Sequence, residues 1–344
     1  MIERRKEDHI RICLEEEVEV KTDYWKMIRF SHKAAPEIDM DEISLNTGFL
    51  GNDLSAPLII SAITGGYDGA MEYNHRLSAA AKEVGIAFGV GSQRPALENR
   101  ELRDSYEVIK RNRPPLVMGN LGAPQIIDQK GKHIFTVEDG LEAMEMIGAQ
   151  CLAIHFNYLQ EVVQPEGDLR AKGVMEALED FCKELPVVAK ETGAGIDSES
   201  ASDFKKAGVK AIDVGGMGGT SFSAVEYYRE GANKRLAGEL WDWGIPTPAS
   251  IIECRRAVDL PMIATGGVRS GLDAAKAIAL GADIAGIAGG VLPHASLSLE
   301  ATVEYLENIL RELRTVMFLL GCKNVDELRN QRIIITESLR DWII

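Results

Sequence analysis

The stretch CLAIHFNYLQEVVQPEGD, residues 151–168, combines a short apolar run with a polar, irregular continuation. We interpret residues 151–156 as a β-strand, because the run is short and leads into loop-like sequence. Side chains alternate along a strand, so one face is apolar while the other carries small residues and ends in His155 and Asn157. Such a strand is typical of a barrel whose outer face packs under helices and whose carboxyl end opens into an active site. Gln160 and Glu161 follow just past that end.

Seven other apolar runs share this character, and segments with helical patterning lie between them. The eight runs are LIISAI (58–63), IAFGVG (86–91), LVMGNL (116–121), CLAIHF (151–156), VVAKET (187–192), AIDVGG (211–216), MIATGG (262–267) and IAGIAG (284–289). The helical segments include 71–84, 137–147, 174–184, 198–207, 248–258 and 271–280, and residues 296–320 resemble a long final helix. Eight alternating units with right-handed crossovers close into a barrel. We therefore predict a single-domain α/β protein, a (β/α)8 TIM barrel over residues 56–320, with an N-terminal extension (1–55) and a C-terminal tail (321–344).

Composition narrows the class of protein. The chain has 344 residues, 45% of them hydrophobic, and a net charge of −15. An acidic chain of this kind is a poor general nucleic-acid binder, because phosphate contacts need a basic surface. The five cysteines form no CxxC pair, which fits reduced thiols in the cytoplasm. No apolar run reaches the roughly 18 residues of a membrane span, and the first residues lack a signal-peptide core. We expect a cytoplasmic protein without nucleic-acid or membrane partners.

Glycines gather after the seventh and eighth runs, in TGGVRSG (265–271) and AGG (288–290). In barrels the loops after these two strands commonly bind phosphate through backbone N–H groups and the start of a short helix. Plain turns are the alternative. Because two such clusters fall in the two expected loops, we favour a phosphorylated cofactor such as FMN.

Other strand ends carry polar groups whose meaning is open from the residues alone. Arg94, beside a serine, suits an anion but also suits a surface ion pair. Lys190 is either a cation inside the barrel or an outward lysine between helices. Residues 215–221, GGMGGTS, suit a phosphate cradle or a mobile loop, and the long stretch to Gly244 suggests a lid. The basic start of the chain is either a solvated helix or an arm over the site.

Nine segments, in order and between residue 4 and about residue 320, resemble the type 2 isopentenyl-diphosphate isomerases. They are RRKEDHI (4–10), TGFLGNDLSAPLIISAITGG (47–66), GVGSQRPALE (89–98), GNLGAPQ (119–125), HFNYLQEVVQPEGD (155–168), AKETGAGI (189–196), GGTS (218–221), WGIPTPAS (243–250) and TGGVRSGLDAAKAIALGADIAGIA (265–288). The resemblance implies an FMN-dependent barrel enzyme that interconverts isopentenyl and dimethylallyl diphosphate. It also implies Mg²⁺, a reduced flavin commonly supplied by NADPH, and a homo-oligomer, a tetramer or octamer.

The same resemblance implies roles for individual residues. It implies that the substrate is bound by Arg5, Lys6, His9, Ser92, Gln93, Arg94, His155, Asn157 and Gln160. It implies that FMN is bound by Ala62, Ile63, Thr64, Ser92, Asn120, Lys190, Thr220, Gly267, Val268, Arg269, Ala288 and Gly289. Glu161 then holds the metal, and the residues nearest the chemistry are Gln160, His155 and Lys190.

Physical chemistry agrees with these expectations. Moving a double bond adds a proton at one carbon and removes one at another, and an alkene is a very weak base. The motif offers an amide, Gln160, rather than an obvious acid, so we favour the reduced flavin as the acid and base. Lys190 near its pyrimidine end favours the anionic form, and Glu161 suits hard Mg²⁺. Two alternatives are an FMN-dependent 2-hydroxy-acid oxidase, whose histidine and arginine pair we do not find, and a flavin-binding protein without turnover.

Overall fold

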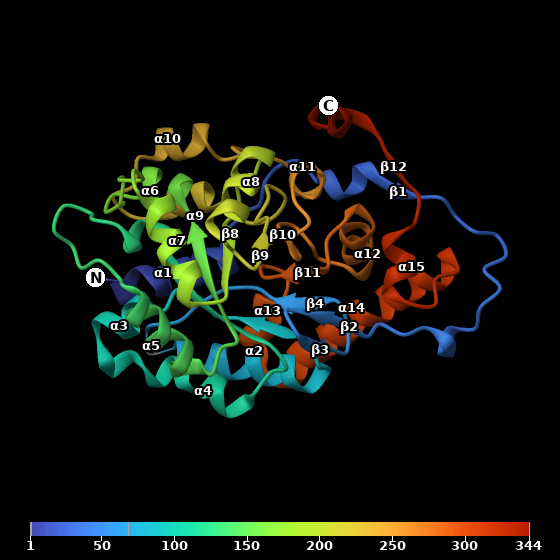
Figure 1. The fold of residues 1–344 in the computed structure, drawn as a ribbon, viewed down its shortest axis with the longest axis horizontal. Helices are drawn as coiled ribbons and strands as arrows, with labels where there is room; N and C mark the ends of the chain where they lie inside the picture. The colour runs from blue at the N-terminus through green and yellow to red at the C-terminus, as the bar shows by residue number, and fades with distance from the viewer. Residues whose placement is uncertain (1, 68, 344) are drawn as a thin grey trace.

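Eight parallel strands form a closed barrel in the computed structural model, which describes residues 2–67 and 69–343, with side chains from residue 5 onward (Figure 1). The strands are β4 (Leu58–Ile60), β5 (Ala87–Gly89), β6 (Val117–Gly122), β7 (Cys151–Phe156), β8 (Val187–Glu191), β9 (Ala211–Asp213), β10 (Met262–Thr265) and β11 (Ile284–Ile287). Each lies within or overlaps one of the eight apolar runs, and β11 closes the circle by pairing with β4. The predicted (β/α)8 barrel is confirmed.

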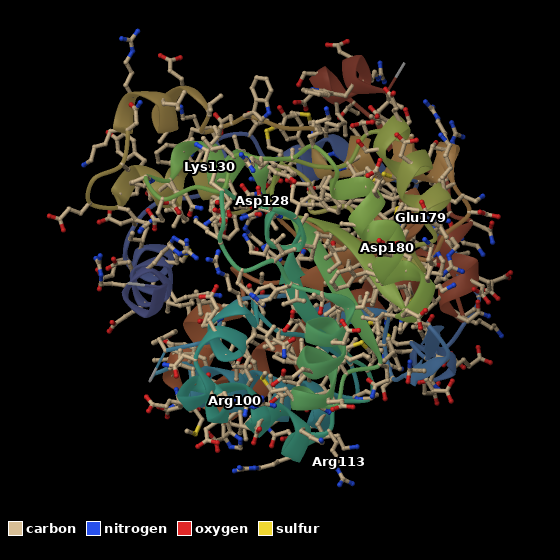
Figure 2. The ribbon with its side chains drawn as sticks, turned by 60° about the vertical axis from the view of Figure 1, so that its left-hand side comes forward. Arg100, Arg113, Asp128, Lys130, Glu179 and Asp180 are labelled. Carbon is tan, nitrogen blue, oxygen red and sulfur yellow. The ribbon has the colours of Figure 1, made fainter. Side chains whose placement is uncertain are left out.

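Helices surround the strands (Figure 1). The longer ones are α2 (Ala70–Val84), α4 (Asp104–Asn112), α5 (Val137–Ile147), α7 (Val174–Glu184), α8 (Ser198–Ala207), α11 (Thr247–Ala257) and α12 (Gly271–Leu280). Charged side chains on their outer faces point to solvent, as Glu179 and Asp180 of α7 do in Figure 2. The six predicted helical segments therefore form helices, to within a residue at their ends.

The predicted long final helix (residues 296–320) is present, but it begins at Leu299, after a break at Ser298. The helices α13 (Leu292–Leu297) and α14 (Leu299–Leu320) meet at Ser298, whose backbone is extended. The Ser298 hydroxyl accepts the N–H of Ala301, which caps α14. The prediction was wrong at this point because helical periodicity continues across a capping serine.

The core has two layers, one inside the barrel and one between the strands and the surrounding helices. The inward face of the barrel is small and apolar, with Cys151 and Ala153 packed beside Met118 and Ile263. Phe49 joins this inner cluster from a hairpin of β2 (Thr47–Phe49) and β3 (Asn52–Leu54). The outward side chains of the same strands, such as those of Leu152 and Ile154, pack with the helices. The alternation predicted for residues 151–156 is therefore present.

The N-terminal extension and the C-terminal tail pair with each other through one short strand each. In the N-terminal extension, α1 (Ile2–Glu15) is followed by the 3-10 turn η1 (Tyr24–Met27), β1 (Ile28–Phe30) and the turn η2 (Met40–Glu42). The tail forms α15 (Val325–Arg329), β12 (Ile333–Ile335) and η5 (Glu337–Trp342). β12 pairs antiparallel with β1, and the two lie side by side in Figure 1.

Short helices lie in the connections that follow the carboxyl ends of several strands. They are α3 (Arg94–Glu98), η3 (Arg100–Leu102), η4 (Ala123–Ile126), α6 (Tyr158–Val163), α9 (Phe222–Tyr228) and α10 (Lys234–Glu239). The expected loop and lid between Gly215 and Gly244 therefore contain α9 and α10. Within the described part of the chain, no helix combines the length and apolarity needed to cross a bilayer.

Candidate functional site

A cavity of about 930 Å³ lies at the carboxyl ends of the barrel strands, within the range that holds cofactor-sized ligands. All the predicted site residues except Gln93 line it. They are Arg5, Lys6, His9, Ala62, Ile63, Thr64, Ser92, Arg94, Asn120, His155, Asn157, Gln160, Glu161, Lys190, Thr220, Gly267, Val268, Arg269, Ala288 and Gly289. The fold therefore brings together side chains that are scattered over nearly 300 positions of the sequence.

The N-terminal arm covers one end of the cavity. Its helix α1 packs on α9 through Ile12, beside Ala224 and Val225. Arg5 and Lys6 consequently line the cavity rather than solvent, and the Lys6 ammonium donates to the Ser92 carbonyl at 3.3 Å. The basic start of the chain is therefore an arm over the cavity and not a solvated helix.

Three cations meet at this end of the cavity. Arg94 begins α3, and its guanidinium donates to Glu98 (2.8 Å) and to buried Asp168 (3.2 Å). Burial, together with the nearby charges of Arg5 and Arg94, lowers the pKa of Lys6 to about 7. Cations packed this closely repel one another, so the cluster is suited to a multiply charged anion.

His155 is oriented by a chain of hydrogen bonds. Asn120 donates its amide to the Val90 carbonyl at 2.9 Å, which turns its side-chain oxygen toward His155. The His155 Nδ1 atom lies 2.6 Å from that oxygen, so Nδ1 carries the proton and Nε2 is an acceptor. Burial, then the charges of Lys6 and Lys190, lower the pKa of His155 to about 3. The imidazole is therefore neutral before any anion enters the cavity.

Gln93 has a different place from the one expected. Its side chain is fully buried, donates to the Ala143 carbonyl (2.7 Å) and accepts the Asn120 N–H (3.0 Å). Both ends of the amide are used inside the protein, so Gln93 does not reach the cavity. We correct its role from binding the diphosphate to holding Asn120, and through it His155.

An oxygen-rich corner surrounds Glu161. This carboxylate is 5% exposed and accepts the amide groups of Asn157 (3.0 Å) and Gln164 and the N–H of Asp168 (2.7 Å). Burial raises its pKa, although these hydrogen bonds oppose the shift. The side-chain oxygens of Asn157 and Gln164 are buried without a hydrogen-bond partner. A carboxylate beside unpaired amide oxygens fits a hard cation such as Mg²⁺.

Among the described residues, no group of three or more His, Cys, Asp or Glu side chains could hold a metal ion alone. A cation here would therefore need oxygens from a ligand. Mg²⁺ bound through one or two carboxylates and substrate phosphates behaves in that way.

Glu226, which the sequence analysis missed, links the arm to the motif after β7. It is fully buried in α9 and lies 2.9 Å from His9 Nε2, and it accepts from Gln160 Nε2 at 3.2 Å and from Arg229 at 2.5 Å. Burial would raise the pKa of Glu226, but His9 and Arg229 outweigh it and lower the pKa. A lone glutamate in FSAVEYY gives no local signal, so only the fold identifies it.

Lys190 points into the barrel, as the first of its two interpretations expected. It is 5% exposed and donates to Asp213 at 2.7 Å, while the Thr265 hydroxyl donates to the other oxygen of Asp213 at 2.6 Å. Asp213, also missed from sequence, therefore compensates the buried ammonium. This pair lies between the cationic end and the glycine loops.

The glycine loops form the other end of the cavity. Gly266 and Gly267 have φ of 114° and 78°, and a Cβ at Gly267 would lie 2.0 Å from the Gly218 carbonyl. Only glycine permits this approach of two loops. The Arg269 guanidinium pairs with Glu19 at 2.6 Å and donates to the Gly218 and Gly267 carbonyls. Backbone rather than charge therefore dominates here, which fits a flavin phosphate.

The sequence is similar to a flavin-dependent protein family and to named isomerases. The family model described as FMN-dependent dehydrogenase matches residues 99–335. An isopentenyl-diphosphate delta-isomerase of Archaeoglobus fulgidus is 48% identical over 99% of this chain and 98% of its own. The enzyme of the same name from Thermoplasma volcanium is 45% identical, over 100% of this chain and 99% of its own.

Among solved structures, a mandelate oxidase with (S)-2-phenylpropionate is 19% identical and has a TM-score of 0.65, covering 97% of each chain. A lactate oxidase of Pediococcus acidilactici is 16% identical with a TM-score of 0.62, covering 96% of this chain and 87% of its own. At such identities the likeness concerns the fold alone.

Proposed function

Since this chain belongs to the isopentenyl-diphosphate delta-isomerase family and matches the FMN-dependent dehydrogenase family, we propose that it interconverts isopentenyl and dimethylallyl diphosphate with FMN as its cofactor. The observation that carries the proposal is the cation cluster of Arg5, Lys6 and Arg94 at the arm end of the cavity. A depressed lysine pKa between two arginines is unfavourable until an anion arrives. A diphosphate supplies that charge.

Binding the diphosphate recruits protons to the chain. Neutral His155 offers an acceptor at Nε2, which repels phosphate oxygens, whereas the imidazolium donates to them. The anion raises the pKa values of His155 and Lys6 because it stabilises their charged forms. We infer that substrate binding is accompanied by proton uptake at these two residues. Arg94 is held in place by Asp168.

The hydrocarbon end is prepared by positioning. The Gln160 amide nitrogen donates to Glu226, and its amide oxygen accepts from the Asn157 amide at 3.2 Å. These two bonds fix the orientation of the Gln160 amide. Lys190 brings a cation, balanced by Asp213, to the part of the cavity between the two anion-binding ends. FMN in its reduced form supplies the acid and base for the allylic proton shift. NADPH is our expected reductant.

We assign Mg²⁺ to Glu161. The unpaired oxygens of Asn157 and Gln164 support a cation in this corner, where it would also neutralise the diphosphate. In Glu161→Gln the carboxylate becomes a weaker neutral ligand. We expect the Mg²⁺ concentration for half-maximal activity to rise by an order of magnitude or more. A metal titration identical to that of the unchanged protein would count against the assignment.

One experiment tests the whole proposal. The purified protein is loaded with FMN, reduced anaerobically with dithionite or NADPH, and given isopentenyl diphosphate with Mg²⁺. We expect dimethylallyl diphosphate to form, and neither oxidised flavin nor EDTA-treated protein to support turnover. Absence of product under reducing conditions would refute the proposal. Oxidation of mandelate or lactate instead would indicate a 2-hydroxy-acid oxidase.

The acid-base role is tested separately. Reconstitution with 5-deazaFMN, which lacks the N5 atom, should abolish turnover, and full activity would refute this assignment. Two further expectations accompany the proposal. Free thiols such as Cys151 and Cys254 fit a cytoplasmic enzyme, and we expect a homo-oligomer, a tetramer or octamer, which sedimentation velocity would reveal.

A further inference from the structure

The carbonyl of Gly266, at the glycine end of the cavity, is held by two donors from outside it. The indole N–H of Trp25 donates to this oxygen at 3.0 Å, and the Thr247 hydroxyl donates at 2.9 Å. Trp25 is 1% exposed and Thr247 is fully buried. Neither is among the residues that line the cavity, whereas Gly266 and Gly267 are. The carbonyl is thus fixed toward the protein interior.

The direction of the Gly266 carbonyl also sets the direction of the Gly267 N–H. In a trans peptide, the carbonyl of one residue and the N–H of the next point in opposite directions. With the Gly266 oxygen fixed away from the cavity, the Gly267 N–H is directed toward it. Within the described residues, this N–H donates no hydrogen bond to the protein. A free N–H at the glycine end is a donor suited to a phosphate oxygen.

We propose that Trp25 is a positioning residue for the flavin phosphate, acting with Thr247 through the Gly266 carbonyl to direct the Gly267 N–H at the phosphate. The proposal rests on FMN occupying the cavity as proposed above. Trp25 never touches the cofactor. It comes from the N-terminal extension, 241 residues away in sequence from the glycine it holds.

Trp25 is itself well anchored. Its backbone N–H donates to Asp23 at 3.1 Å, and its carbonyl accepts the buried ammonium of Lys276 at 2.7 Å. Lys276 belongs to α12, the helix that follows the glycine loop. These bonds fix the Trp25 backbone, and the indole itself is buried in the core cluster around the barrel, so its N–H is a fixed donor.

The test compares two flavins. Apoprotein is titrated with FMN and with riboflavin, which lacks the phosphate, and binding is followed by the quenching of flavin fluorescence. Trp25→Phe keeps an aromatic ring but removes the donor. We expect its FMN dissociation constant to rise about threefold to tenfold, the usual worth of one hydrogen bond. The riboflavin dissociation constant should stay within about twofold, because that ligand makes no phosphate contact.

Thr247→Val removes the second donor and should give a similar loss. The double variant should lose more than the product of the two single losses, because either donor alone still holds the carbonyl. Trp243→Phe is the matched control, since this indole is 62% exposed and lines no part of the main cavity. It should leave the dissociation constants of both FMN and riboflavin unchanged.

Equal losses for FMN and riboflavin would overturn the proposal, because they would show that Trp25 only packs. Unchanged FMN binding would overturn it too. If Trp25→Phe fails to fold, 3-benzothienylalanine placed at position 25 removes the N–H and keeps the ring shape. The affinity of that variant for FMN relative to riboflavin must then fall. A protein that binds neither flavin would refute the proposed function instead. The ³¹P NMR shift of bound FMN gives a second readout that packing alone would not move.

Discussion

The two ends of the cavity are suited to anions by opposite means. At the arm end, Arg5, Lys6 and Arg94 supply charge through long side chains, and each arginine is balanced by a carboxylate. At the glycine end the donors are backbone, and Arg269 is occupied by Glu19 and two carbonyls. Charge attracts a diphosphate quickly and lets protons and metal set its affinity. Rigid N–H groups instead suit a phosphate that stays bound.

We expect the largest effect from a substitution that removes a cation from the arm end of the cavity. Arg94→Met removes a cation that Asp168 and Glu98 hold in place, and it leaves Asp168 with fewer partners. We expect kcat/KM for isopentenyl diphosphate to fall about 10²- to 10³-fold, with FMN affinity unchanged. Steady-state kinetics and flavin titration measure the two. Arg103→Met is the control, because Arg103 pairs with Glu107 and Glu142 away from the cavity.

The backbone end is broken by Gly267→Ala. The residue has a φ of 78°, and the new Cβ would meet the Gly218 carbonyl at 2.0 Å, so the two loops must separate. We expect FMN affinity to fall about 10- to 100-fold. Gly131→Ala provides the control, because it has a φ of 82° with nothing within 4 Å. If both substitutions weakened FMN equally, close loop packing would be irrelevant to cofactor binding.

The pH dependence sharpens the comparison. The pKa of Lys6 is lowered to about 7, and only its cationic form attracts the diphosphate. As the pH rises above 7, the protonated fraction falls, so kcat/KM should decline up to about tenfold per pH unit. Lys6→Arg stays charged and should flatten this limb. Because substrate ionisation is the same for both proteins, an identical decline in the variant would exclude Lys6 as its cause.

The smallest effect is expected at the rim. Lys132 pairs with Asp168, but its side chain is 48% exposed and does not line the cavity. Lys132→Ala should therefore change KM by no more than about threefold, as for other solvent-screened ion pairs. A loss comparable to that of Arg94→Met would extend the charged end beyond the cavity.

The barrel could be predicted because its signals are local. Each strand is a short apolar run, and each of the glycine clusters follows a strand directly, so order along the chain gives position in space. Motif spacing placed Gln93 near the anion but could not say which way its side chain turns. Glu226 was missed because its partner His9 lies 217 positions away in α1. Asp213 was missed although it pairs with Lys190 from the neighbouring strand, because an acidic residue inside the apolar run 211–216 does not reveal which residue it faces. Trp25 gave no signal, since its role depends on one carbonyl across the fold.

Pairing between β1 and β12 has a consequence for how the protein is made. The N–H and hydroxyl of Thr336 both bond to the carbonyl of Met27, 309 positions earlier, and Met27 ends the turn that contains Trp25. During translation this contact can form only after the last strand has left the ribosome, and closing so long a loop is slow. The frame behind the glycine loop at Gly266 is therefore completed last, and a chain that stops a dozen residues early lacks the strand that closes it.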